Sequence, residues 1–119
     1  MPVRIGITID CPDPEQLAAF WTRFLGYRRR PGGADGTYVT IDRPDGVEGP
    51  PHVTFQRVAE PKASKARAHL DLFVEHARPM VDEMVGAGAV TIATNEAGEW
   101  TTRVLQDPAG NEFCVIGPD

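Results

Sequence analysis

Residues 3–27 read VRIGITIDCPDPEQLAAFWTRFLGY, and this stretch decides how the chain begins to fold. Its opening residues alternate between aliphatic side chains and small or polar ones, which is typical of a strand with one apolar face. Asp13 can then cap a helix, Pro14 suits the first helical position, and Gln16 completes a capping box. Apolar side chains follow at helical spacing until Gly26, so the stretch predicts a strand that leads directly into a helix.

The same order of elements is predicted twice along the chain. In the first half, strand patterns at residues 27–30, 37–42 and 52–58 follow the strand and helix. In the second half, the order is a strand at 67–75, a helix at 76–85, and strands at 90–94, 100–105 and 112–117. Two copies of β-α-β-β-β, joined by a polar linker, predict an α+β domain with both helices on one side of the sheet.

Strand alternation sorts the side chains of the predicted sheet onto two faces. The apolar face, which should pack on the helices, includes Val53, Phe55, Leu70, Leu72, Phe113 and Val115, opposite a helix stripe of Met80, Val81, Met84 and Val85. The other face carries His52, Gln56, Arg67, His69, Asp71 and Cys114. A curved sheet would gather these side chains into a polar-lined cup, the usual design of a small-molecule site, whereas a plain solvated face is the alternative.

Size and charge narrow the class of protein. The 119 residues suit one domain, 1–119, with module one at about 1–58 and module two at about 66–119. The net charge of −5 predicts no attraction to nucleic acid or to an anionic membrane. No apolar run approaches the roughly 20 residues of a membrane span, and no leader pattern precedes the first strand, so we expect a cytoplasmic protein. Cys11 and Cys114 are expected to be free thiols there.

Four stretches of the chain resemble a known family. They are DPEQLAAFWTRFLGY at residues 13–27, KASKARAHLDLFV at 62–74, GAGA at 86–89 and DPAGNEFCV at 107–115. Together they resemble the vicinal oxygen chelate superfamily, the glyoxalase/bleomycin resistance/dioxygenase group, and above all its small single-domain glyoxalase-like proteins. The resemblance implies two βαβββ modules that form a cupped mixed β-sheet with helices on the outer face and, commonly, a homodimer.

The resemblance also implies a divalent metal, held by a His on the first strand of a module and a Glu on its last strand. In this sequence the two His positions fall on Gly6 and His69, and the two last-strand positions fall on Gln56 and Cys114. Glycine cannot ligate, and a His with an amide and a thiol is a poor donor set for Mg, Mn or Ni, which prefer oxygen and imidazole. We therefore predict no tightly bound metal or other cofactor, and leave open a weak divalent ion at His69.

Two functions follow from the polar face. The first is a protein that binds a small organic molecule in the cup, with ligand-binding residues His52, Gln56, Arg67, Trp100 and Cys114. The second is a lyase, isomerase or dioxygenase that acts on a carbonyl or vicinal-oxygen substrate, with His69 and Asp71 as the catalytic pair. A module that mainly dimerises is a third reading. A homodimer is expected in each case, because a second copy can cover the edges of an open sheet.

Several of these residues also have a structural reading. Trp100 could belong to the core instead of a cup rim, and His52 could be an ordinary surface residue. Cys114 acts as a nucleophile only if its pKa is lowered, and a buried inert thiol is the alternative. Asp107 begins a turn, DPAGN, that is expected to fix the register of the last strand.

Overall fold

A computed structural model describes residues 7–33, 35–60, 62–64 and 68–119. The chain divides into two compact units, Met1–Pro61 and Lys62–Asp119. Each unit consists of a four-stranded mixed sheet and one helix. The predicted α+β class is confirmed, and so is the order β-α-β-β-β in both halves.

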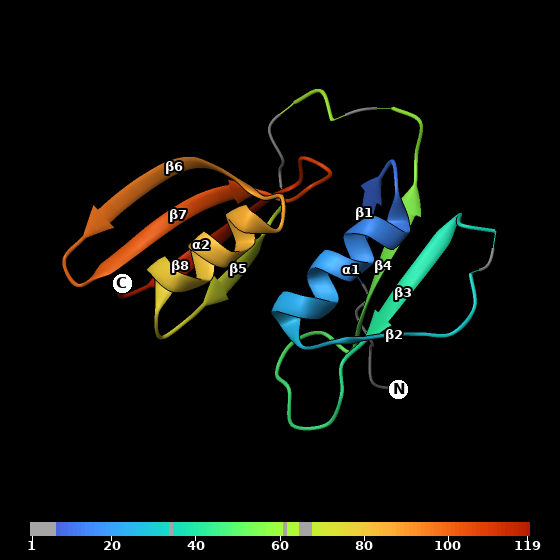
Figure 1. Cartoon of the computed structure of the whole chain (residues 1–119), viewed down its shortest axis with the longest axis horizontal. Helices are drawn as coiled ribbons and strands as arrows, with labels where there is room; N and C mark the ends of the chain where they lie inside the picture. Colours follow the sequence, from blue (N-terminus) through green and yellow to red (C-terminus); the bar gives the residue numbers. More distant parts are fainter. Residues whose placement is uncertain (1–6, 34, 61, 65–67) are drawn as a thin grey trace. The chain divides into compact units, whose positions relative to one another are not determined.

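The first unit contains β1 (Ile7–Cys11), α1 (Pro14–Leu25), β2 (Arg28–Arg29), β3 (Tyr38–Asp42) and β4 (His52–Arg57). Its strands lie in the order β1-β4-β3-β2, and β1 runs parallel to β4 while the other neighbours are antiparallel. Helix α1 packs against β3 and β4 (Figure 1). One face of this sheet is therefore covered by a helix.

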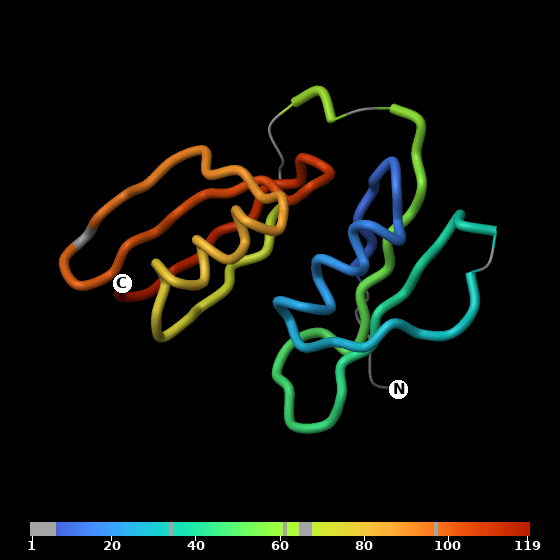
Figure 2. The backbone as a smooth tube through the Cα atoms, in the orientation of Figure 1, coloured from blue at the N-terminus to red at the C-terminus, as the bar shows by residue number. Residues whose placement is uncertain are grey.

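The second unit contains β5 (Leu70–Phe73), α2 (Ala77–Gly86), β6 (Val90–Ala97), β7 (Trp100–Gln106) and β8 (Glu112–Gly117). Its order, β5-β8-β7-β6, repeats that of the first unit, with β5 parallel to β8. Figure 2 follows the backbone from β5 through α2 and the β6–β7 hairpin back to β8, which lies beside β5. Strand β6 reaches Ala97, beyond the predicted end at residue 94, because it pairs with β7 as far as Trp100.

The local signals around α1 are confirmed. The Gln16 backbone N–H donates to Asp13 Oδ1 over 3.3 Å, and Pro14 is the first helical residue. Gly26 ends the helix with a φ of 72°, a left-handed conformation that favours glycine, and its N–H donates to the Thr22 carbonyl over 3.0 Å. Both ends of the helix are thus determined by residues that neighbour it in sequence.

The helix-facing side of each sheet forms the core of its unit. In the first unit, the largest buried side chains are Leu17, Trp21, Val39, Ile41, Val53 and Phe55. In the second, they are Val81, Met84, Leu105, Phe113 and Val115. The predicted stripe of α2 was wrong at Val85, which is exposed, because it lies about 100° round the helix from Met84 and beyond the face that meets the sheet. Met80 is half-buried at the other edge of the stripe.

The predicted turn before the last strand is built around one carboxylate. Asp107 is buried, and its Oδ1 accepts hydrogen bonds from the backbone N–H groups of Ala109 and Asn111, each over 2.9 Å. Such a side chain replaces the turn's missing backbone partners and holds β8 in register with β7. No helix in the described ranges is long and apolar enough to cross a membrane.

Candidate functional site

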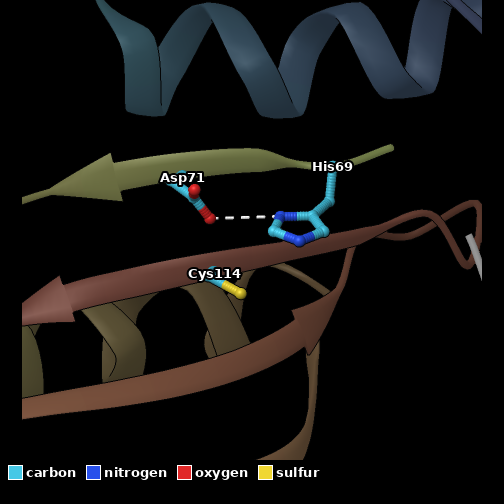
Figure 3. A group of neighbouring side chains, drawn as sticks. All are labelled: His69, Asp71 and Cys114. Carbon is cyan, nitrogen blue, oxygen red and sulfur yellow. Dashed lines mark ion pairs between the residues drawn. The ribbon is translucent and has the colours of Figure 1, made fainter. Parts of the chain in front are cut away.

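Three polar side chains meet on the face of the second sheet that α2 does not cover, called the second open face below. Strands β5 and β8 run parallel, and their register places Asp71 beside Cys114. Neighbours across a ladder point to the same side, and His69, two residues before Asp71, shares that side. Figure 3 shows the side chains of His69, Asp71 and Cys114 directed toward one another from these two adjacent segments.

The imidazole and the carboxylate of this cluster are paired. His69 Nδ1 lies 3.1 Å from Asp71 Oδ1, and both side chains are more than two-fifths exposed. In a neutral imidazole, the Nδ1–H donates to the carboxylate and leaves Nε2 as an acceptor. A carboxylate that orients an imidazole in this way is the usual support of a general base. The pair can therefore accept a proton or a hydrogen bond from a bound molecule.

Cys114 is the buried member of the cluster, with 8% of its surface exposed. Burial raises the pKa of its thiol, and the negative charge of Asp71 and a hydrogen bond to that carboxylate raise it further. Both effects stabilise the protonated form. The thiol is consequently a hydrogen-bond donor at neutral pH, and this environment favours the inert thiol over the nucleophile.

The same cluster contains three potential metal ligands. One donor atom from each of His69, Asp71 and Cys114 lies within 4.8 Å of the others, so three ligand types are close together. The implied ion would prefer oxygen and imidazole donors, and Cys114, whose pKa is raised, would first have to lose its proton. The His69 Nδ1 is engaged by Asp71, which leaves one ring nitrogen for a ligand. These residues fit the family's divalent metal poorly.

An exposed aromatic pair lies on the same open face. Phe73 follows Asp71 by two residues on β5, and Trp100 begins β7 with the parity of Thr102 and Val104, which the register places beside Ile116 and Cys114. The two rings are 6.5 Å apart at an interplanar angle of 62°. Trp100 is 49% exposed and so does not belong to the core. Phe73 was missed in the sequence, although its parity with Asp71 was a usable signal.

The open face of the first sheet holds the other predicted residues. Gln56 lies beside Tyr38, whose hydroxyl accepts a bond from Gln56 Nε2 over 3.4 Å. His52 is placed across from Asp42 by the register, and both are half-buried. The residues predicted as one site therefore fall on two different sheets. Gly6 and Arg67 lie outside the described residues.

The comparison with protein families decides the identity of the fold. The model of the glyoxalase-like domain matches residues 6–116. The chain belongs to the glyoxalase-like domain family. The two repeated modules of this glyoxalase-like domain are those of the vicinal oxygen chelate fold, as the resemblance implied.

Solved structures agree with that assignment. A glyoxalase/bleomycin resistance protein/dioxygenase family enzyme from Burkholderia phytofirmans has a TM-score of 0.73 and 20% identity, covering 96% of this chain and 97% of its own. A fosfomycin resistance protein from Mesorhizobium loti has a TM-score of 0.72 and 12% identity, covering 100% and 94%. A bleomycin-binding protein from Streptomyces verticillus, complexed with copper(II)-bleomycin, has a TM-score of 0.58 and 16% identity, covering 99% and 96%.

No curated protein matches the sequence of this glyoxalase-like domain. At 12–20% identity, the solved structures establish the fold alone.

Proposed function

We propose that this glyoxalase-like domain binds a small organic molecule on the second open face, at His69, Asp71 and Cys114. The convergence of these three side chains on the uncovered side of one sheet is the observation that carries the proposal. A polar cluster of this kind, half exposed and surrounded by less polar strand residues, suits a ligand with hydrogen-bonding groups. His52 and Gln56 lie on the first sheet and Arg67 lies outside the described residues, so these three are not part of the proposed site.

Binding without a metal is the form of the proposal that the donor chemistry favours. A relative of this fold binds bleomycin, and another confers fosfomycin resistance, so the fold serves more than one purpose. In this chain the acceptors of His69 and Asp71, together with the protonated thiol of Cys114, can hold a neutral or cationic polar group directly. A metal could bind Nε2 of His69 and leave the pairing with Asp71 in place, but it would have to displace the proton of the Cys114 thiol.

A second candidate is an enzyme that uses His69 as a general base. The 3.1 Å pairing of His69 Nδ1 with Asp71 favours it, because that contact orients the ring and leaves Nε2 to accept a proton. The substrate would be a carbonyl or vicinal-oxygen compound with a proton that Nε2 can remove. Mass spectrometry of a bound compound after long incubation separates the two candidates: an unchanged mass supports binding, and a new product supports the enzyme.

The test of the site is a thermal-shift screen of diverse small molecules against the wild type and His69→Ala. A ligand at 100 times its Kd stabilises the fold by about 2.7 kcal/mol, which moves Tm by several degrees. His69→Ala and Asp71→Asn should remove most of that shift. His76→Ala is the matched control, because His76 is an exposed residue of the same unit that makes no side-chain cap at α2. A shift that survives His69→Ala intact contradicts the proposal.

Metal addition tests the chemistry of the same cluster. Purified protein without a tag should contain no stoichiometric metal by elemental analysis. Micromolar Mn, Ni, Zn or Fe should leave Tm unchanged in the wild type and in His69→Ala alike, because stabilisation follows the ratio of metal concentration to Kd. Near-stoichiometric metal that is lost in His69→Ala would contradict this expectation and favour the enzyme.

We also propose a cytoplasmic homodimer, since β6 offers an exposed edge for a second copy. Light scattering at micromolar concentration should then give twice the mass of one chain. A mass near 13.0 kDa, that of a single chain, would count against the dimer.

A further inference from the structure

Phe73 and Trp100, here called the aromatic pair, form an apolar patch that the proposed site leaves unused. Phe73 is 68% exposed and Trp100 is 49% exposed, yet the two rings contact each other edge to face. Two large rings held together at a surface expose apolar area to water, which is unfavourable unless a ligand or partner covers it. Such rings can stack on a planar molecule at little entropic cost.

The size of the patch argues for a small ligand instead of a protein surface. A stable protein–protein interface buries about 800 Å² on each partner, far more than the exposed parts of two rings can supply. The register places Ile116 beside Phe73 and Ala97 beside Trp100. Thr102, which pairs with Ile116, lies two residues from Trp100 on β7, and both Thr102 and Ile116 are half-buried. The patch is thus small and bordered by a polar side chain.

The spacing along β5 ties the aromatic pair to the polar cluster. A strand rises about 3.3 Å per residue, so Phe73 lies roughly 7 Å from Asp71 and roughly 13 Å from His69 along the strand. A molecule whose ring stacks on the aromatic pair would place its next ring or short chain over Asp71 and Cys114. Both groups lie on the same face, so no strand needs to move.

The charges at the cluster define the polar end of that molecule. The Asp71 carboxylate accepts hydrogen bonds, and so does Nε2 of a neutral His69. A phenol O–H or an amine N–H can therefore bind there, whereas a carboxylate would meet the negative charge of Asp71. The Lys62 ammonium is paired with the Glu112 carboxylate over 3.0 Å and so does not offer a free positive charge to such a carboxylate.

We propose that the ligand of this domain is a planar aromatic molecule with a hydrogen-bond donor about 7–13 Å from the stacked ring, estimated from the strand rise. The ring contacts the aromatic pair, and the donor contacts Asp71 and His69. This inference rests on the proposed function and adds Phe73 to the site.

Three matched probes test the ligand class by isothermal titration calorimetry. 4-Phenoxyphenol has both the ring and the donor, 4-phenoxyanisole lacks the donor, and 4-(cyclohexyloxy)cyclohexanol lacks the aromatic rings. The phenol should bind at least tenfold more tightly than either comparator. Equal affinity of the phenol and the cyclohexanol would overturn the aromatic part, and equal affinity of the phenol and the anisole would overturn the donor part.

Variants of the aromatic pair locate the stacking. Trp100→Ala and Phe73→Ala should each weaken 4-phenoxyphenol about tenfold, and Phe73→Leu should do so while it keeps apolar volume. Val85→Ala, at an exposed apolar residue of α2, should change nothing. Quenching of tryptophan fluorescence provides a second readout, because Trp21 is buried and only Trp100 is open to the probe. An unquenched Trp100, or aromatic variants that bind as tightly as the wild type, would overturn the inference.

The failures of the inference and of the proposed function give different results. If compounds bind and depend on His69 but ignore Trp100 and Phe73, the aromatic inference fails and the proposed function stands. If the phenol depends on Trp100 and Phe73 but not on His69, the cluster is not the site and both fail in their present form. If Trp100→Ala dissociates a dimer in light scattering without changing probe affinity, a second copy covers the pair and the inference is wrong.

Discussion

The two units differ in how their open faces use polar side chains. On the first sheet, the polar side chains bond to each other: the Thr40 and Thr54 hydroxyls are 2.9 Å apart, and Arg30 holds Asp42 with two bonds of 2.6 and 2.9 Å. On the second sheet, the His69–Asp71 pair is half exposed beside a buried thiol and an exposed aromatic pair. The same strand order thus carries polar side chains that bond to each other in one module and polar side chains that are exposed to a ligand in the other.

The cause of the difference lies in side-chain type, because the backbones are alike. Each sheet has its first and last strands parallel and its helix on one face. Threonines opposite each other satisfy their own hydroxyls, and a bidentate arginine satisfies a carboxylate. An imidazole with one nitrogen engaged keeps an acceptor for a ligand. A ligand is therefore expected to bind where the pairing of polar side chains is incomplete, and five substitutions test the comparison of the two units.

The largest expected effect is a loss of stability from substitutions in the two cores, and it should be similar in both units. Phe55 and Phe113 occupy equivalent helix-facing positions, on the fourth strand of each module, and are 0% and 1% exposed. Phe55→Ala and Phe113→Ala should each lower the free energy of unfolding by about 3–5 kcal/mol through the lost burial and the cavity left behind. Urea unfolding measures both. A loss below about 1 kcal/mol in only one variant would break the equivalence of the modules.

A smaller effect on Tm is expected at low pH, and a carboxylate of the second unit should contribute more to it than its counterpart in the first unit. Asp119 accepts from Arg103 and Arg78 over 2.7 and 2.9 Å, and these hydrogen bonds lower its pKa from 3.8 to about 2. A lowered folded-state pKa stabilises the fold above the unfolded value, and that stability is lost as pH falls from about 4 toward 2. Asp119→Asn should therefore flatten the fall of Tm between pH 5 and pH 2.

The matched control for that titration is Asp42→Asn in the first unit. One arginine, Arg30, lowers the pKa of Asp42 through its hydrogen bonds, and His52 adds a smaller electrostatic effect, so this change should flatten the acid limb less than Asp119→Asn. Scans of Tm at half-unit pH steps, in the wild type and both variants, give the comparison. If Tm falls with pH identically in the wild type and in Asp119→Asn, the pKa of Asp119 does not change on folding, and the prediction is wrong.

The smallest expected effect concerns the threonine pair of the first open face. Thr40→Val removes one partner of a part-buried hydroxyl pair and should cost about 1 kcal/mol or less in the free energy of unfolding. It should leave the affinity of any ligand of the second open face unchanged. Urea unfolding and calorimetry check the two statements. A tenfold loss of ligand affinity in Thr40→Val would show that the first open face also takes part in binding.

The sequence alone determined the elements and their faces. Asp13, Pro14 and Gly26 determine the ends of α1 because capping acts between residues a few positions apart. The alternation in residues 52–58 and 112–117 predicted the burial of Phe55 and Phe113, since one face of a half-covered strand must be apolar. The family followed from stretches spread over most of the chain and is confirmed by the match to residues 6–116.

Only the tertiary structure decided which polar residues meet. Asp71 and Cys114 are neighbours because β5 pairs in parallel with β8, and the register of strands far apart in sequence depends on the packing of the whole unit. The same packing brings Phe73 to Trp100 and leaves Val85 outside the stripe of α2. Local periodicity assigns a side chain to a face, but its partners on that face depend on contacts between distant segments, which no short stretch of sequence encodes.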